Sequence, residues 1–74
     1  RKTRTRVQSL LDELVEAGFD AVRIETQLEA ADDIADICRL TCLEKGLRVA
    51  DGDEHVPLLL IRGRKVYLEM EQPV

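Results

Sequence analysis

The residues of this chain best suited to chemistry are two cysteines and one histidine. Cys38 and Cys42 stand four positions apart within a helical pattern, and His55 follows an acidic turn. Helical neighbours at this spacing hold their Cβ atoms about 5–6 Å apart, wider than the roughly 3.5–4.5 Å of a disulfide. We therefore expect free thiols, which indicate a reducing, cytoplasmic location.

Together with His55, the two cysteines could offer three ligands to a zinc ion and leave an open position of the catalytic type. Both cysteines, however, stand where small apolar residues face a core, and free cysteine is among the most buried residue types. Core packing is the favoured interpretation and redox sensitivity the alternative. We predict no metal and no cofactor.

Acid–base catalysis would require His55 to act on a nucleophile or a positioned water. Asp51 and Asp53 could orient the imidazole, but Ser9 is the only serine and lies in a separate helical segment. The DGDE sequence at 51–54 resembles a calcium loop over four residues only, since no distal glutamate follows. We predict no catalytic residue and expect a protein that is not an enzyme.

Composition and charge describe one small folded domain, 1–74, with 45% hydrophobic and 35% charged residues. The first six residues hold four of the eleven basic residues and no acid, so 7–74 carries 7 basic against 15 acidic residues, a net charge of −8. A body this acidic repels a phosphate backbone. No apolar run approaches the roughly 18 residues of a membrane span, so we expect no membrane partner.

Nucleic-acid contact would therefore depend on the basic N-terminal arm at 1–4, on Arg6, and on the basic tip of a predicted hairpin. The candidate residues are Arg1, Lys2, Arg4, Arg6, Arg62, Arg64 and Lys65. The alternative is a solvated arm and a soluble turn.

The spacing of apolar residues predicts two helices. After the arm, Thr5 and Gln8 have capping-box spacing ahead of an apolar stripe that ends before Gly18. Thr26 and Glu29 repeat that spacing and predict a longer helix at 27–45, which Gly46 closes.

Three strands are predicted around these helices. Alternation at 20–25 indicates a short strand, and VPLLLIRGRKVYLEM at 56–70 indicates a hairpin around Gly63 with strands at 56–61 and 66–70. The crossover through the second helix should set 20–25 parallel to 56–61. The segment 47–50 is expected to be a short extended piece and 71–74 a frayed tail.

The predicted fold class is α/β, a small two-layer domain in the order α-β-α-β-β with a three-stranded mixed sheet and a C-terminal β-hairpin. Strands as evenly apolar as 56–61 are usually covered on both sides. The helices could share one face of the sheet or lie on opposite faces, and either arrangement leaves thin cover.

The second predicted helix turns Ile34, Cys38 and Cys42 toward the core and sends Leu40 and Leu43 outward among charges. Two leucines three apart, rimmed by acids, form a plausible contact stripe. The leading hypothesis is a non-enzymatic interaction module that completes its core as a homodimer or on a protein partner. Its predicted partner-binding residues are Asp36, Leu40, Leu43 and Tyr67, the last on the outer hairpin strand.

The sequence VPLLLIRGRKV at 56–66 resembles the proline-led strand and hairpin of thioredoxin- and glutaredoxin-like domains. The resemblance implies that Pro57 matches their cis-proline beside the thiol site. The family's first strand and its cysteine-containing turn are missing, and Cys38 and Cys42 lie elsewhere. The resemblance therefore implies a degenerate thioredoxin-like domain without thiol activity.

Overall fold

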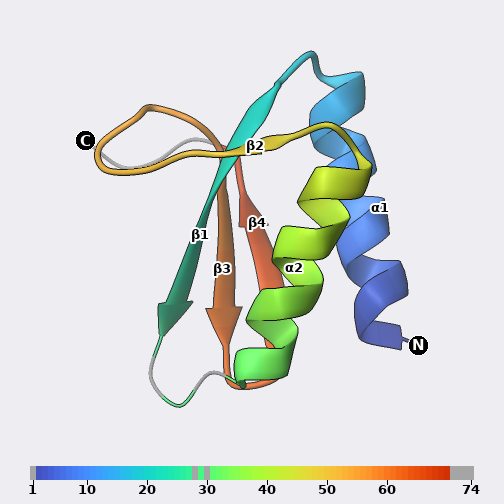
Figure 1. Ribbon diagram of the computed structural model, residues 1–74, viewed down its shortest axis with the longest axis vertical. Coiled ribbons are helices and arrows are strands. Elements are labelled where there is room, and N and C mark those ends of the chain that lie inside the picture. The colour runs from blue at the N-terminus through green and yellow to red at the C-terminus, as the bar shows by residue number, and fades with distance from the viewer. Residues whose placement is uncertain (1, 28, 30, 71–74) are drawn as a thin grey trace.

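The computed structural model describes residues 2–27, 29 and 31–70. Two helices, α1 (Lys2–Glu16) and α2 (Asp32–Glu44), accompany a mixed sheet. The strands are β1 (Ala21–Gln27), β2 (Arg48–Val49), β3 (Leu58–Arg62) and β4 (Lys65–Glu69), in the spatial order β2-β1-β3-β4 (Figure 1). The α/β class is confirmed.

Both helices cover the same face of the sheet, which gives two layers (Figure 1). One apolar stripe of each helix packs on the strand side chains that point toward it. The fully buried centre of this core includes Val7, Leu11, Leu14, Val22, Ile34, Cys38, Cys42, Leu59 and Ile61.

The predicted strand pairings are confirmed. β1 runs parallel to β3, from the pair Arg23 and Leu58 to the pair Gln27 and Arg62. β3 and β4 form an antiparallel hairpin. Gly63 begins its two-residue turn with a φ of 60°. Primed hairpin turns require a positive φ at this position, and residues with a side chain adopt it only with strain.

The prediction of three strands is wrong, because the extended piece after α2 forms a fourth strand. β2 pairs parallel with β1, and the amide of Arg48 donates to the carbonyl of Asp20 at 2.9 Å. Ala50 donates in the same way to Val22 at 2.9 Å. A two-residue strand is too short to show alternation, so its pairing depends on the backbone of β1. The observed order is α-β-α-β-β-β.

The predicted basic arm is also wrong where the structure describes it, since α1 already begins at Lys2. Thr5 lies inside the helix and therefore does not cap it. Arginine and lysine are good helix formers, and Arg4 pairs with Glu44 of α2 at 2.8 Å. Arg1 and the predicted frayed tail at 71–74 lie outside the described residues.

The second helix begins five residues later than predicted, because β1 continues through Thr26 to Gln27. The ladder to β3 uses these residues for strand pairing and overrides the capping-box spacing. Ala31 takes the N-cap position without a side-chain cap, and its amide donates to the carbonyl of Gly63 at 3.1 Å. The start of α2 is thus tied to the hairpin turn.

The opposite face of the sheet has partial cover. The 50–57 loop lies on that side (Figure 1), and at this end Ala21 and Leu58 expose only 1% and 6% of their surface. Farther along, Leu60 is partly buried and Tyr67 is exposed. The fold therefore covers most of the apolar β3 run by itself, more fully than the sequence suggested.

Candidate functional site

The two thiols belong to the core. Cys38 and Cys42 are free and fully buried on the inner face of α2. Burial raises the pKa of each thiol from 9.0 to about 11, and for Cys38 the neighbouring Cys42 adds to this effect. A thiol with so high a pKa forms little thiolate near neutral pH and is a poor nucleophile. The core-packing interpretation is confirmed.

His55 does not come together with the thiols. It is exposed in the 50–57 loop, whereas both cysteines lie under the helix layer. Among the described residues, no group of three or more His, Cys, Asp or Glu side chains is placed to hold a metal ion.

The thioredoxin-like expectation is wrong at its decisive residue. The Val56–Pro57 peptide bond is trans, as are all bonds between described residues. The resemblance required a cis bond there.

The outer face of α2 carries a second feature, which we call the leucine stripe and define as Leu40 and Leu43 with their neighbours Asp36 and Arg39. Leu40 exposes 60% and Leu43 77% of its surface, the highest values among large apolar side chains in the described part of the chain. Arg39 and Asp36 form an ion pair of 3.6 Å beside them. The outward direction predicted for both leucines is confirmed.

Tyr67 does not belong to the same surface. Its neighbours in β4, Val66 and Leu68, pack on the core beneath the helices. Because side chains alternate along a strand, Tyr67 points to the other side of the sheet. The four predicted partner-binding residues thus divide between the helix layer and the open sheet face.

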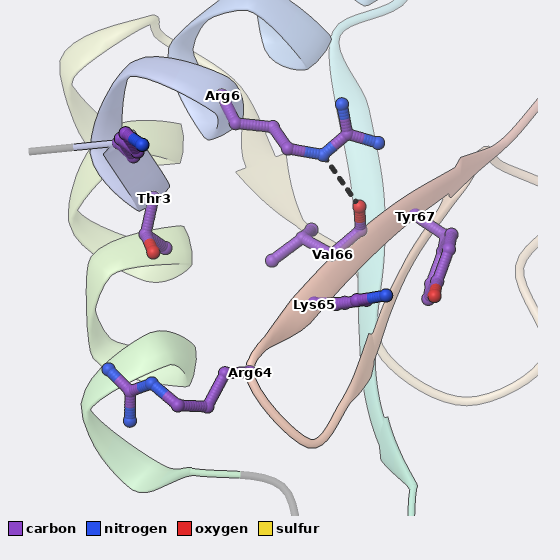
Figure 2. A pocket seen from close by; sticks show the side chains of 7 residues that line it. Thr3, Arg6, Arg64, Lys65, Val66 and Tyr67 are labelled. Atoms are coloured by element: carbon purple, nitrogen blue, oxygen red, sulfur yellow. Dashed lines mark hydrogen bonds between the residues drawn. The ribbon is translucent and has the colours of Figure 1, made fainter.

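Strand β4 forms one edge of the sheet. Arg62 and Lys65 close the two-residue turn, so the next pair along, Ile61 and Val66, turns its backbone groups away from the hairpin. Arg6 of α1 occupies this position, since its Nε donates to the carbonyl of Val66 at 3.1 Å (Figure 2). A side chain of α1 therefore caps one free carbonyl of the edge.

A pocket of about 360 Å³ opens beside this contact. Figure 2 shows Arg6 reaching from α1 to the main chain of β4, while Arg64 extends toward α2. Four basic residues and no acidic residue line the pocket. The full lining is Lys2, Thr3, Arg6, Arg64, Lys65, Val66 and Tyr67. We call it the basic pocket.

The basic pocket differs from the rest of the molecule in how its cations are paired. Six of the ten described basic residues form ion pairs with carboxylates. They are Arg4, Arg23, Arg39, Lys45, Arg48 and Arg64. Arg62 bonds to the side-chain oxygen of Gln27 instead. Lys2, Arg6 and Lys65 have no carboxylate partner among the described residues, and all three line the pocket.

The predicted nucleic-acid set is thus brought together only in part. Lys2 and Arg6 line the same pocket as Arg64 and Lys65, as expected if folding joined the N-terminus to the hairpin tip. Arg4 instead points to Glu44, and Arg62 bonds to Gln27 of β1. Thr3 and Tyr67 were missed as lining residues. Helical spacing could have separated Lys2 and Arg6 from Arg4, since residues 2 and 6 are four apart and share a helix face.

Comparisons with protein-family models, curated proteins and solved structures found no match for this chain. Within the described residues, neither helix combines the length and the apolar character needed to cross a membrane.

Proposed function

We propose that this chain is a non-enzymatic interaction module that forms a homodimer through the leucine stripe. The observation that carries the proposal is the exposure of Leu40 and Leu43, 60% and 77%, on a single helix face. A 74-residue domain buries only about 60% of the surface that its unfolded chain exposes, so apolar contact with a second copy adds appreciably to its stability. The partly covered open sheet face gives weaker support, because the 50–57 loop already shields Leu58.

The stripe suits contact with its own copy across a two-fold axis. In an antiparallel pair of α2 helices with Leu40 on the partner's Leu43, the same symmetry sets Arg39 opposite Glu44 of the other copy. Apolar contact at the centre and opposite charges at the rim are typical of specific interfaces. This self-complementarity is why we choose a second copy over an unrelated protein as the occupant.

A reducing, cytoplasmic setting completes the proposal. Its support is the presence of two free, buried thiols and no disulfide between them.

The test compares the solution mass of the unmodified chain with that of a Leu40→Lys, Leu43→Lys double variant. Lysine favours helix, and at position 40 it stands four residues from both Asp36 and Glu44, so α2 should stay folded. The variant is expected to be monomeric at concentrations where the unmodified chain is a dimer. Circular dichroism of both proteins checks that the fold is retained.

A Leu40→Glu, Leu43→Glu variant separates apolar contact from net charge, since it should give the same monomer with the opposite charge change. Tyr67→Glu with Met70→Glu is the matched control, because it adds two acids outside α2 and should leave the dimer intact. The proposal is rejected if this control breaks the dimer while the α2 variants do not. A dimer unaffected by every variant rejects it as well.

A proline at Tyr67 would not be a suitable test of whether a partner pairs with the free edge of β4. Tyr67 lies opposite Leu60 in a pair whose backbone groups face each other, so proline there would remove a hydrogen bond of the hairpin itself. Any loss of the dimer would then report an altered fold.

A further inference from the structure

Strand β4 is an edge of the sheet with few of the features that protect edges. Its five residues pair with β3 in one continuous register without a bulge, and they include neither proline nor glycine. Its charged residues, Lys65 and Glu69, stand at the two ends of the strand. Natural edge strands are usually shortened, bulged or covered, because an exposed edge pairs readily with another strand. The middle of β4 is therefore suited to accept one.

The backbone groups that a new strand would use belong to Val66 and Leu68. Both occupy positions of the hairpin whose N–H and C=O groups point away from β3. The one contact that the described part of the chain makes with these outward groups is the bond from Arg6 Nε to the carbonyl of Val66, at 3.1 Å. Arg6 thus stands where an added strand would place its own amide.

The residues of the basic pocket lie on both sides of this edge. Lys2 and Arg6 come from α1 on the helix side, whereas Lys65 and Tyr67 alternate with Val66 and point toward the open sheet face (Figure 2). They therefore do not converge on one small ligand. They flank the line along which a strand beside β4 would run, and the side chains of such a strand also alternate between the two faces.

From this arrangement we infer that β4 binds an acidic, extended segment of another protein, which adds to the sheet as an antiparallel strand. Main-chain hydrogen bonds to Val66 and Leu68 hold the segment, and carboxylates on its helix side meet Lys2 and Arg6. The pocket is lined by four basic residues and no acidic one, so an acidic segment is the complementary partner. When an amide of the segment takes the carbonyl of Val66, the Arg6 guanidinium is released to one of these carboxylates.

A second copy of β4 suits this edge less well. Two copies paired across a two-fold axis would set Lys65 opposite Glu69, but they would also bring Lys2 and Arg6 of both chains to the same side of one seam, where like charges repel. The inference goes beyond the proposed dimer and does not depend on it, because the leucine stripe belongs to α2.

The experiment is an NMR titration of the full chain with a capped synthetic heptapeptide in which valine alternates with glutamate, at constant ionic strength. Opposite residues of an antiparallel pair that exchange hydrogen bonds point their side chains to the same face, so glutamates paired with Val66 and Leu68 lie on the helix side. The amides of Val66 and Leu68 are expected to become protected from hydrogen exchange. Those of Lys65 and Tyr67 already bond within the hairpin and should change less.

Two N-methylated forms of the peptide test the pairing without altering the protein. Methylation of the glutamate amides removes the donors that face β4 and should abolish binding. Methylation of the valine amides blocks only the far edge of the peptide and should leave binding intact.

Charge is tested with a peptide that carries lysine in place of glutamate, which should bind about tenfold more weakly. In the protein, Lys2→Gln should weaken binding of the glutamate peptide about threefold. Its matched control, Arg39→Gln, removes the same charge from α2 and should leave the affinity unchanged. Arg6 is not used for this purpose, because its loss would remove a cation and also free the carbonyl of Val66.

An absence of added protection at Val66 and Leu68 would overturn the inference, as would equal binding of the lysine peptide. Loss of binding on methylation of the valine amides rather than the glutamate amides would contradict the antiparallel placement. Protection of Val66 and Leu68 that rises with the concentration of the chain alone would assign the edge to a second copy. These results do not depend on the leucine-stripe variants, so failure here and failure of the proposed dimer are distinguishable.

Discussion

Helix α2 carries apolar side chains on both its inner and its outer face, and the two sets differ in burial. On the inner face Ile34, Cys38 and Cys42 have no exposed surface, while Leu40 and Leu43 on the outer face expose 60% and 77%. The inner side chains pack in one core with residues of α1 and of the sheet, so the monomer already buries them. The outer leucines contribute nothing comparable to the folded chain, and this contrast is the basis for proposing that they serve a second copy.

The largest expected effect comes from truncating one residue on each face. Ile34→Ala should lower the free energy of unfolding by about 2–5 kcal/mol, because it leaves a cavity in the core. Leu40→Ala should change the stability of the monomer by about 0.5 kcal/mol or less, since that side chain is mostly solvated. Urea unfolding at concentrations below dimerisation measures both, and similar losses would erase the contrast between the faces.

A second, smaller effect follows from the buried thiols. Their folded pKa of about 11 lies above the unfolded value of 9.0, so the unfolded chain ionises first as the pH rises. The stability they contribute is therefore fully present below pH 9 and is lost as the pH approaches 11. The urea midpoint should fall as the pH rises across this window, and it should fall less in a Cys38→Ala, Cys42→Ala variant. Parallel curves for the two proteins would show that the thiols have the same pKa in the folded and in the unfolded chain.

The smallest effect concerns the loop that covers the open sheet face. Arg48 holds Glu54 by two hydrogen bonds of 2.9 and 3.0 Å, which lowers the pKa of that carboxyl below its ordinary 4.5. The pair stabilises the folded state above pH 4.5 and loses this contribution as the pH falls through the lowered pKa. Both groups are exposed, so the direct measurement is an NMR titration of Glu54. Its pKa should return toward 4.5 in an Arg48→Gln variant, and an unchanged value would show that the salt bridge does not form in solution.

Much of the fold could be predicted because periodicity reports burial. The α2 residues Ile34, Cys38 and Cys42 were assigned to the core, and Leu40 and Leu43 to the surface, from angular position alone. The parallel crossover and the hairpin at Gly63 followed from apolar runs and turn chemistry. The predicted element boundaries were wrong where a local signal competed with tertiary pairing. Thr26, for example, has capping-box spacing but pairs with Ile61 in the β1–β3 ladder.

The binding surfaces could be predicted only as sets of residues, because their grouping depends on which side of an element each side chain takes. Tyr67 was grouped with Leu40, yet strand alternation sends it to the opposite side of the sheet. Arg4 was grouped with Arg6, yet it pairs across the helices with Glu44. Ion-pair partners 40 residues away cannot be found from spacing along the chain, and those partners decide which cations remain available.

The most direct test of the proposed dimer is the solution mass of the unmodified chain by light scattering across a dilution series, with reductant present. The account predicts a dimer that dissociates on dilution, because a small interface centred on two leucines gives moderate affinity. A mass equal to one chain of 8.4 kDa at every concentration would contradict it and would leave the leucine stripe as solvated surface.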